Sequence, residues 1–353
     1  MRIKSTLCLR KEGFTMWTEA ILDKKLSTPS QKLIADIAAI EGDIMILGAG
    51  GKMGPSLCLL AKRAADSAGI SKRIIAVSRF SDPIATKLLV DNEIETISMD
   101  MMEPGQVDTL PDCENIIYMA GRKFGTDGQE YLTWAMNAWL PSLVAEKFRN
   151  SRIVVFSSGN IYPIVPLATG GCTEEMRVVP AGEYAMSCLA RERMFEYASK
   201  TYGTSTFVYR LNFAVDLRYG VLYDIASKIL SGGAISVETP VFNCIWQGDA
   251  NEIAIRALLH TTSPGNIVNV TGPEMVSVKY AANRLGALLG REPIFSGTEQ
   301  SDAYISNAAK SAALFGYPTV GIETLIEWQA QWIQSGGRAL GKATHFEQRK
   351  GSY

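Results

Sequence analysis

The stretch EYAMSCLARE, residues 183–192, carries two side chains that can do chemistry. If the stretch is helical, Tyr184 and Cys188 share one face, because positions i and i+4 are neighbours on a helix. A tyrosine hydroxyl can donate or accept a proton, and a cysteine thiolate can act as a nucleophile. A thiol without a histidine partner is more often an inert apolar residue. We therefore expect proton transfer by Tyr184.

A glycine-rich loop, ILGAGGKMGPSL, is the second chemical feature. Gly48, Gly51 and Gly54 permit a tight turn, close approach of a pyrophosphate and an open helix N-terminus. The loop follows a predicted strand and opens a predicted helix, which is the context of a dinucleotide-binding motif. We predict that this loop, with Lys52 and Met53, binds a dinucleotide.

The end of the second predicted strand bears on the choice between NAD and NADP. In NAD sites an acidic residue there binds the adenosine ribose hydroxyls. Ser78 and Arg79 stand there in IIAVSRF, and Lys52 lies in the glycine loop. Two cations without a carboxylate favour a 2′-phosphate, although either cation can be a solvated surface residue. We expect NADP as the preferred cofactor and NAD as the alternative.

Alternating strands and helices must position these residues. Continuous apolar runs separated by helical stretches are typical of a parallel sheet covered on both faces. The sequence predicts an α/β fold, a doubly wound parallel sheet (Rossmann fold) with a smaller C-terminal substrate lobe. The predicted strands are 43–50, 73–80, 95–100, 115–121, 152–159 and 204–212.

The domain organisation follows from these elements. The expected parts are 1–40, an N-terminal extension with a helix in 28–40; 41–212, the dinucleotide-binding domain, to which 240–262 return; 213–239 and 263–340, the smaller lobe; and 341–353, a tail. The tail is either a loose end or a segment that folds over the site. Met16 is a second candidate start, which would make residues 1–15 an extension.

Composition and residue counts exclude several classes of protein. The formal net charge is −1, so nothing points to nucleic acid. Two histidines, His260 and His345, are too few for a metal cluster or Ser–His catalysis. The six cysteines are scattered without a CxxC motif, and no apolar run reaches the roughly 18 residues of a membrane span. We predict a cytoplasmic protein that binds no metal, nucleic acid or membrane.

Together the motifs resemble those of extended short-chain dehydrogenase/reductases of the NAD-dependent epimerase/dehydratase type, from about residue 43 to 335. The resemblance implies dinucleotide binding, with Ser158 and Tyr184 as catalytic residues. The matching residues are Gly48, Gly51 and Gly54 of GxxGxxG; Asp100 with Met101 after the third strand; Ala120 and Gly121 after the fourth; Asn137 on the next helix; Ser158 of SSGNIY; Tyr184 and Cys188 at the ends of YxxxK; and Glu192 downstream.

The chain departs from this family at position 188. The resemblance implies a lysine that binds the nicotinamide ribose and lowers the tyrosine pKa, but this chain has Cys188. A unit charge about 4 Å away, at an effective dielectric constant of about 20, is worth roughly 4 kcal/mol, or about three pKa units. We therefore expect Tyr184 to keep a pKa of about 10. A protonated tyrosine is an acid rather than a base, which favours carbonyl reduction.

Arg122 and Lys123, in AGRKFG after the fourth predicted strand, are candidates for the missing cation. We expect Lys123 to lie near the nicotinamide, and the alternative is that both are ordinary loop cations. The sequence leaves open whether Cys188 is a functional replacement or a loss of activity.

A second departure concerns the substrate. Family members that act on nucleotide sugars commonly carry an arginine seven residues before the aspartate that matches Asp249, and Phe242 stands there. A diphosphate buried without its cation is costly. We therefore expect a small carbohydrate-like substrate, such as a sugar, sugar acid or lactone, rather than a nucleotide-diphosphate sugar. The candidate contacts are Lys123, Ser158, Asn160, Asn212, Trp246 and Gln247.

These motifs predict an NAD(P)-dependent oxidoreductase or epimerase-type enzyme. The first alternative is a non-catalytic NAD(P)-binding regulator or sensor that has lost the lysine, and the second is a lyase or isomerase that returns the cofactor unchanged. Helices at 131–149 and 184–200 form a dimer interface in many relatives of the family. The resemblance therefore implies a homodimer, with Trp134, Trp139 and Leu140 as candidate contacts.

Overall fold

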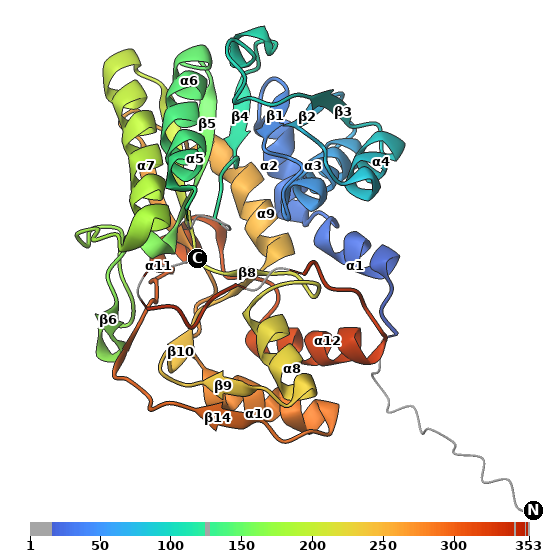
Figure 1. The fold of residues 1–353 in the computed structure, drawn as a ribbon. Coiled ribbons are helices and arrows are strands. Elements are labelled where there is room, and N and C mark those ends of the chain that lie inside the picture. Colours follow the sequence, from blue (N-terminus) through green and yellow to red (C-terminus); the bar gives the residue numbers. More distant parts are fainter. Residues whose placement is uncertain (1–15, 124–127, 342–343, 350, 352–353) are drawn as a thin grey trace, which may run out of the picture.

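A seven-stranded parallel sheet forms the centre of the structure (Figure 1). The computed structural model describes residues 16–123, 128–341, 344–349 and 351, so the alternative start and the extension 1–15 lie outside the described residues. The strands, in spatial order, are β12 (Asn266–Val270), β7 (Ser205–Leu211), β5 (Arg152–Ser158), β4 (Asn115–Tyr118), β1 (Ile44–Leu47), β2 (Ile74–Ser78) and β3 (Glu95–Ser98). Every neighbouring pair is parallel, which confirms the predicted fold.

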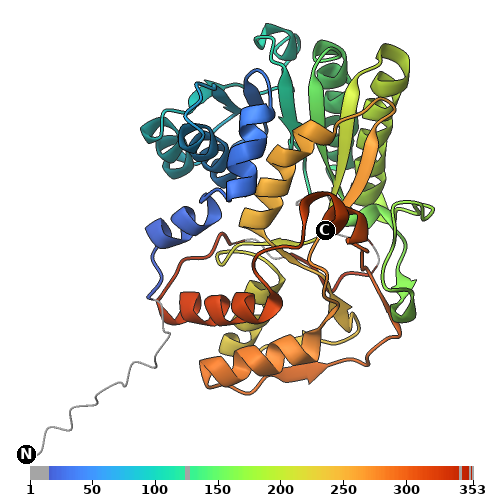
Figure 2. The ribbon, with the colours of Figure 1, turned by 180° about the vertical axis from the view of Figure 1, so that it is seen from behind.

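Helices cover both faces of this sheet (Figures 1 and 2). One face is covered by α2 (Gln31–Ala39), α3 (Gly54–Ser67), α4 (Pro83–Asp91), α9 (Gln247–Arg256) and α11 (Ala309–Phe315). The other is covered by η1 (Val107–Thr109), α5 (Glu130–Trp134), the π-helical turn η2 (Ala135–Trp139), α6 (Leu140–Lys147) and α7 (Gly182–Tyr202). All residues of β1, IMIL, are buried, because both of its faces meet helices.

The segment before the sheet forms two helices. The predicted helix within 28–40 is α2, which begins after Ser30, whose hydroxyl accepts a hydrogen bond from the Leu33 amide at 3.1 Å. The preceding helix α1 (Glu19–Leu26) was not predicted. Its Leu22 packs into the core of the smaller lobe, so this segment ties the two parts of the chain together.

A smaller lobe lies below the carboxyl ends of the strands in Figure 1. Its apolar core includes Trp246 and Trp332 and is separate from the two cores of the sheet. Its helices are α8 (Val221–Ser231), α10 (Val278–Leu289) and α12 (Ile322–Gln334), with the strand pairs β9 (Ala234–Ser236) and β14 (Ile294–Ser296), and β10 (Val241–Phe242) and β13 (Val276–Ser277). The remaining short elements are β6 (Val165–Pro166) with β15 (Asp302–Ala303), β8 (Ala214–Val215) with β11 (Ile245–Trp246), and the 3-10 turns η3 (Gly159–Ile161), η4 (Leu167–Thr169) and η5 (Ala257–His260).

The predicted domain boundary is wrong at β12. We assigned 263–340 to the smaller lobe, but β12 extends the main sheet beside β7. Val268 and Val270 of β12 are buried in the same core as Phe315 of α11. The run is short and its partner strand lies far earlier in the chain, so only the tertiary pairing reveals its place. Within the segment 240–262, α9 packs on the main sheet, whereas Phe242 and Trp246 lie in the core of the smaller lobe.

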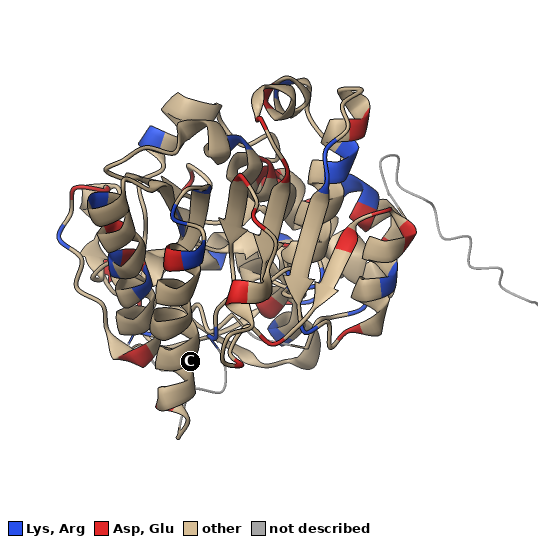
Figure 3. Cartoon of the chain, turned by 90° about the horizontal axis from the view of Figure 1, so that it is seen from above, with Lys and Arg blue, Asp and Glu red and all other residues tan. Residues whose placement is uncertain are grey.

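The helices expected to form a dimer interface expose only some of the predicted residues. Trp139 is 46% exposed, whereas Leu140 is fully buried against the sheet. Trp134 donates a hydrogen bond from Nε1 to Glu183. Charged residues of both signs are interspersed over the helices (Figure 3). The homodimer stays a prediction, without Leu140, whose side chain faces the interior.

A buried ion pair fixes α7 to the sheet. Arg210 of β7 donates from Nη2 to Glu192 of α7 at 2.8 Å, and these side chains are only 5% and 4% exposed. Glu192 also accepts a hydrogen bond from Ser157 at 2.5 Å. These contacts set the rotation of α7 about its own axis, and therefore the face that it turns toward the carboxyl ends of the strands.

We predict that Glu192→Gln lowers the free energy of unfolding by about 3–5 kcal/mol, because it leaves the Arg210 charge buried without a counterion. Glu196→Gln is the matched control, since Glu196 pairs with Lys200 on the exposed side of the same helix, and we expect it to cost at most about 1 kcal/mol. Urea denaturation of both variants measures the difference. Equal costs would contradict the prediction.

Candidate active site

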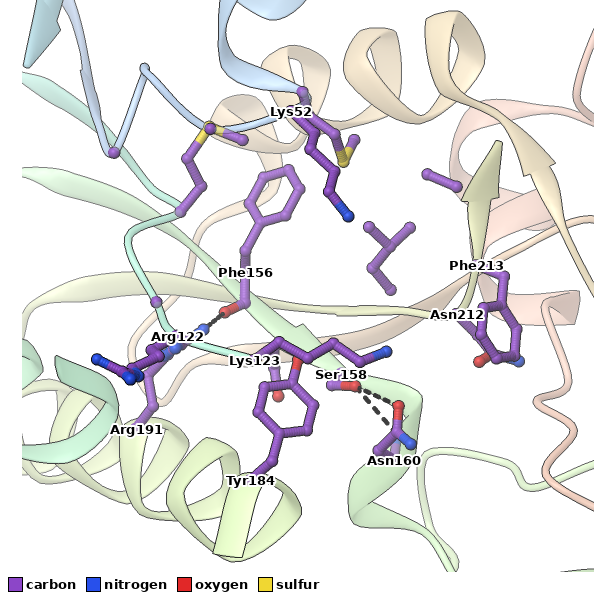
Figure 4. A pocket seen from close by; sticks show the side chains of 18 of the residues that line it. Lys52, Arg122, Lys123, Phe156, Ser158, Asn160, Tyr184, Arg191, Asn212 and Phe213 are labelled. Atoms are coloured by element: carbon purple, nitrogen blue, oxygen red, sulfur yellow. Dashed lines mark hydrogen bonds between the residues drawn. The ribbon is translucent and has the colours of Figure 1, made fainter. Parts of the chain in front are cut away.

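A cavity of about 350 Å³ opens at the carboxyl ends of β1, β4, β5 and β7 (Figure 4). The strand order reverses between β1 and β4, and ligands of doubly wound folds bind at such a reversal. The predicted site residues that line the cavity are Gly48, Gly51, Lys52, Met53, Gly121, Lys123, Ser158, Asn160, Tyr184, Asn212 and Gln247. The fold therefore brings together side chains that lie far apart in the sequence.

The glycine loop has the geometry of a phosphate cradle. Gly48 has φ of +95°, and a Cβ there would lie 2.6 Å from the Ala120 amide nitrogen, so only glycine fits. A Cβ on Gly54 would overlap the Ala49 carbonyl. No side chain caps α3, which begins at Gly54, so its first backbone amides are available to an anion. These residues fit a bound dinucleotide.

The residues at the ends of β2 and β3 contact each other. The Ser78 hydroxyl lies 2.5 Å from where a Cβ of Gly50 would be, which places Ser78 against the glycine loop. Arg79 pairs with Asp100 at 3.6 Å. The Lys52 side chain is directed instead to Tyr219, and its Nζ lies 3.2 Å from the centroid of that ring. The two cations expected at a 2′-phosphate are therefore not adjacent.

Ser158 and Tyr184 meet in the cavity although they come from different elements. Ser158 ends β5 and is 7% exposed. Its hydroxyl donates to Asn160 Oδ1 at 3.0 Å and accepts from the Asn160 amide at 3.1 Å. Tyr184 lies in the first turn of α7, and its side chain hydrogen-bonds to that of Ser158. A substrate oxygen at this point would meet both hydroxyls.

Burial raises the pKa of Tyr184 well above its ordinary value, and the adjacent Cys188 thiol raises it further. Arg191 and the hydrogen bond with Ser158 oppose this shift. We expected a pKa near 10, and the structure moves it higher because the phenol is removed from water. Burial also raises the pKa of the Cys188 thiol, which is fully buried. Both groups are therefore protonated at neutral pH.

Lys123 follows β4 and extends into the cavity (Figure 4). Its Nζ lies 5.6 Å from the ring centroid of Tyr184 and 5.9 Å from that of Phe213, and it donates to the Thr344 carbonyl at 3.5 Å. Burial lowers the pKa of Lys123 to about 8, against the attraction of Cys188 and Asp224. The structure places Lys123 beside Tyr184, and its expected position near the nicotinamide stays a prediction.

Asn137 does not line the cavity but holds residues that do. Its Oδ1 accepts from the Arg122 amide at 2.8 Å, and its Nδ2 donates to the Arg122 carbonyl at 2.8 Å and to Ser187 at 3.0 Å. Asn137 sits in the π-helical turn η2, and such turns often occur at functional sites. This residue therefore positions the loop that carries Lys123 against α7.

The sequence analysis missed Arg191. This residue lies seven positions after Tyr184 on α7, lines the cavity and is 6% exposed. Its Nη1 donates to the Phe156 carbonyl at 2.7 Å, and its Nη2 donates to Asn137 Oδ1 at 2.8 Å. Positions i, i+4 and i+7 form one stripe on a helix, so the spacing from Tyr184 could have identified it.

The remaining substrate candidates divide into two groups. Asn212 lines the cavity beside Phe213, which was not predicted and whose φ of +45° is rare for a bulky residue. Gln247 also lines it and donates to Ser56 at 3.0 Å. Trp246 does not reach it: its ring packs on Trp328 in the core of the smaller lobe, with centroids 5.4 Å apart. Its prediction as a substrate contact is wrong, because its apolar ring is used for packing.

A model of the NAD dependent epimerase/dehydratase family matches residues 44–230, which is more than half of the chain. This match covers the glycine loop, β5 and α7. The chain belongs to the NAD dependent epimerase/dehydratase family. Comparison of the sequence with curated proteins finds no match.

Several solved structures share the fold of this chain. UDP-glucuronic acid 4-epimerase from Bacillus cereus, in complex with UDP-glucuronic acid and NAD, is 18% identical, with a TM-score of 0.66 over 83% of this chain and 99% of that one. WbmG from Bordetella bronchiseptica, in complex with NAD and UDP, is 18% identical, with a TM-score of 0.67 over 86% and 100%. Pal from Bacillus thuringiensis is 15% identical, with a TM-score of 0.68 over 83% and 99%. At these identities the likeness extends to the fold alone.

The C-terminal tail of this family member folds back over the cavity and the smaller lobe. Thr344 donates from its amide to Asp224 at 2.7 Å, and Glu347 pairs with Lys228 at 2.6 Å. Gly351 packs so closely on Gly182 that a Cβ on either residue would overlap the other's surroundings. Of the two possibilities left open for 341–353, the described residues 344–349 and 351 therefore form an ordered strap. The Thr344 carbonyl is the point at which this strap meets Lys123.

The structure gives no sign of a metal site or a membrane span in its described part. Within residues 16–123, 128–341, 344–349 and 351, no three His, Cys, Asp or Glu side chains converge as ligands. Among the same residues, no helix is both long enough and apolar enough to cross a bilayer.

We predict that alanine variants of two glycines in the loop affect different properties, stability for Gly54 and cofactor binding for Gly51. Gly54→Ala forces a Cβ onto the Ala49 carbonyl and should lower the free energy of unfolding by about 1–3 kcal/mol. In Gly51→Ala the nearest atom to the new Cβ lies 3.4 Å away, so stability should change little. The added methyl would instead obstruct a pyrophosphate, and NADH should bind at least about tenfold more weakly. Thermal unfolding and NADH fluorescence titrations measure both effects, and unchanged binding by Gly51→Ala would contradict the cradle.

Proposed function

We propose that this protein is an NAD(P)-dependent oxidoreductase or epimerase-type enzyme that acts on a hydroxyl or ketone of a small carbohydrate-like substrate. The contact between Ser158 and Tyr184 in the cavity that begins at the glycine loop carries this proposal. The two hydroxyls hold a substrate oxygen, with Ser158 polarising a carbonyl and Tyr184 donating its proton. When bound, the nicotinamide ring supplies or accepts the hydride.

The protonated state of Tyr184 favours the reduction direction. A phenol with a raised pKa is a weak base at neutral pH and still donates a proton to a developing alkoxide. In a reduction, the carbonyl carbon gains a hydride, its oxygen gains the proton of Tyr184, and the phenolate is reprotonated from solvent. Apolar side chains, among them Phe156 and Phe213, line part of the cavity around these atoms.

Phe242, at the position where nucleotide-sugar members of the family commonly carry an arginine, lies in an apolar setting. Phe242 is 1% exposed and packs on Phe346 of the strap, with ring centroids 6.2 Å apart. The nearby lobe cations Lys228 and Arg349 pair with Glu347 and Asp302. The solved relatives named above include proteins in complex with UDP or a UDP-sugar, which runs against our expectation. We retain a substrate without a diphosphate as the proposal, and UDP-sugars are its direct competitors in the test.

Of the two cations that the sequence offered for a 2′-phosphate, only Arg79 still supports a preference for NADP. Arg79 remains beside the end of β2, but it pairs with Asp100, and Lys52 is directed to Tyr219. The solved relatives are named with NAD. We propose NADP over NAD on the position of Arg79 and on the absence of a carboxylate at Ser78. A homodimer in the cytoplasm completes the proposal.

The first test is a titration of the purified protein with NADPH and NADH, followed by a reduction screen. We expect micromolar or tighter binding, and oxidation of the cofactor by a sugar, sugar acid or lactone in preference to UDP-glucose and UDP-glucuronic acid. Tyr184→Phe should reduce turnover by about 10²–10⁴-fold without weakening cofactor binding. Tyr197→Phe, on the exposed side of the same helix, is the control and should leave both unchanged.

The outcomes separate the rival functions. Unchanged turnover in Tyr184→Phe would refute the assigned chemistry. Binding without turnover on any substrate supports the non-catalytic regulator, and conversion of substrate without net change in nicotinamide absorbance supports a lyase or isomerase. Absence of binding by a folded sample refutes the oxidoreductase.

We also predict a pH dependence from Lys123. Its ammonium projects into the cavity and would attract the oxygens of a sugar or sugar acid. The pKa of about 8 means that this charge is present below pH 8 and is lost as the pH rises through it. The KM of the best substrate should therefore rise above pH 8, and Lys123→Met should raise KM at lower pH and abolish the step. A step of equal size in Lys123→Met would show that another group titrates.

A further inference from the structure

Arg191 differs from the other buried arginines in its partners. Arg210 pairs with Glu192 at 2.8 Å, and Arg256 pairs with Asp36 at 2.6 Å. Arg191 is as deeply buried, but among the described residues no carboxylate lies within ion-pair distance of it. Its partners are the neutral oxygens of Phe156 and Asn137. A buried charge without a counterion is costly unless the site has a use for it.

The Arg191 guanidinium is also incompletely satisfied. Its Nε has no hydrogen-bond partner among the described residues. Its Nη2 lies so close to Gly121 that a Cβ there would overlap it, so the loop after β4 admits this guanidinium only because position 121 is glycine. Figure 4 shows Arg191 entering the cavity from α7, from the same side as Tyr184. The charge therefore faces the space between the glycine loop and the tyrosine.

The helix geometry relates Arg191 to the missing lysine. Tyr184, Cys188 and Arg191 occupy positions i, i+4 and i+7 of α7 and so lie along one stripe. Position 188 holds a small, fully buried thiol that does not line the cavity, whereas Tyr184 and Arg191 of the same stripe do. A side chain from the next turn, longer than lysine and able to donate several hydrogen bonds in fixed directions, can reach the same region.

We propose that Arg191 supplies the fixed positive charge of this site in place of the lysine that the family pattern has at position 188. It acts on the Tyr184 hydroxyl and on the ribose hydroxyls of the bound nicotinamide dinucleotide, and this inference rests on the proposed function. Lys123 then remains for the substrate. The opposing effect of Arg191 on the raised pKa of Tyr184 agrees with this assignment, whereas Lys123 is not among the leading influences on that tyrosine.

The test moves the charge along the helix. Arg191→Met removes the charge and keeps an unbranched side chain, Cys188→Lys adds the family lysine, and the double variant has only the lysine. Arg193→Met is the matched control, because Arg193 lies on the same helix, is 55% exposed and pairs with Glu196. For each folded variant we measure the dissociation constant of NADH by fluorescence, and the pH dependence of turnover.

Arg191→Met should weaken NADH binding by about 10-fold to 100-fold, the effect of one lost charge-assisted hydrogen bond. The double variant Arg191→Met/Cys188→Lys should recover most of that affinity, and Arg193→Met should bind as the unaltered protein does. Cys188→Lys alone should gain nothing, because two cations then compete for one region. Lysine at position 188 does not restore the contacts of Arg191 with Phe156 and Asn137. Recovered NADH affinity in the double variant would therefore be due to the charge and not to those contacts.

Two results would overturn the inference. The first is unchanged NADH affinity in Arg191→Met, together with loss of affinity in Lys123→Met, which would assign the cation to Lys123. The second is a double variant that folds but does not recover binding, and this result decides the question even if Arg191→Met alone is unstable. An unaltered protein that binds neither NADH nor NADPH refutes the proposed function itself, and the inference with it, so the two failures are distinguishable.

Discussion

The rotation of α7 about its own axis is the constraint on which the site depends. This helix carries Tyr184 and Arg191 on the stripe that faces the cavity, and Glu192 on the adjacent face. The buried pair of Glu192 with Arg210 allows one orientation, because any other rotation would leave two charges in the interior without partners. In an ordinary amphipathic helix an apolar stripe sets the orientation, and in α7 these polar contacts set it. They decide which side chains can meet a ligand.

A second set of contacts places the opposite wall of the cavity. The glycine loop holds the backbone close to the start of α3, and the π-helical turn η2 aims Asn137 at both backbone groups of Arg122. The position of the loop after β4 is therefore set by its contacts with neighbouring helices. The strap then meets this loop at Lys123. The cavity is built from segments that are distant in the chain, so its chemistry depends on tertiary packing.

The proposed role of Arg191 agrees with the balance of charge in this cavity. Burial drives Tyr184 and Cys188 toward their neutral forms and lowers the proton affinity of Lys123. Arginine is the side chain best suited to stay charged in such a setting, since its guanidinium is weakly hydrated and always protonated. In this proposal, Arg191 keeps one positive charge on the helix face where the family pattern has a lysine.

The sequence by itself determined the six predicted strands of the main sheet, the glycine loop, and Ser158 and Tyr184 as members of one set of motifs, because these features are local runs or fixed spacings. It did not determine that β12 joins the main sheet, that Trp246 packs inward, or that Arg191 enters the cavity. Each of these depends on a partner far along the chain: β7, Trp328, and the carbonyl of Phe156. Only the tertiary structure decided which polar side chains find a counterion and which remain for a ligand, since burial and pairing are properties of the assembled fold.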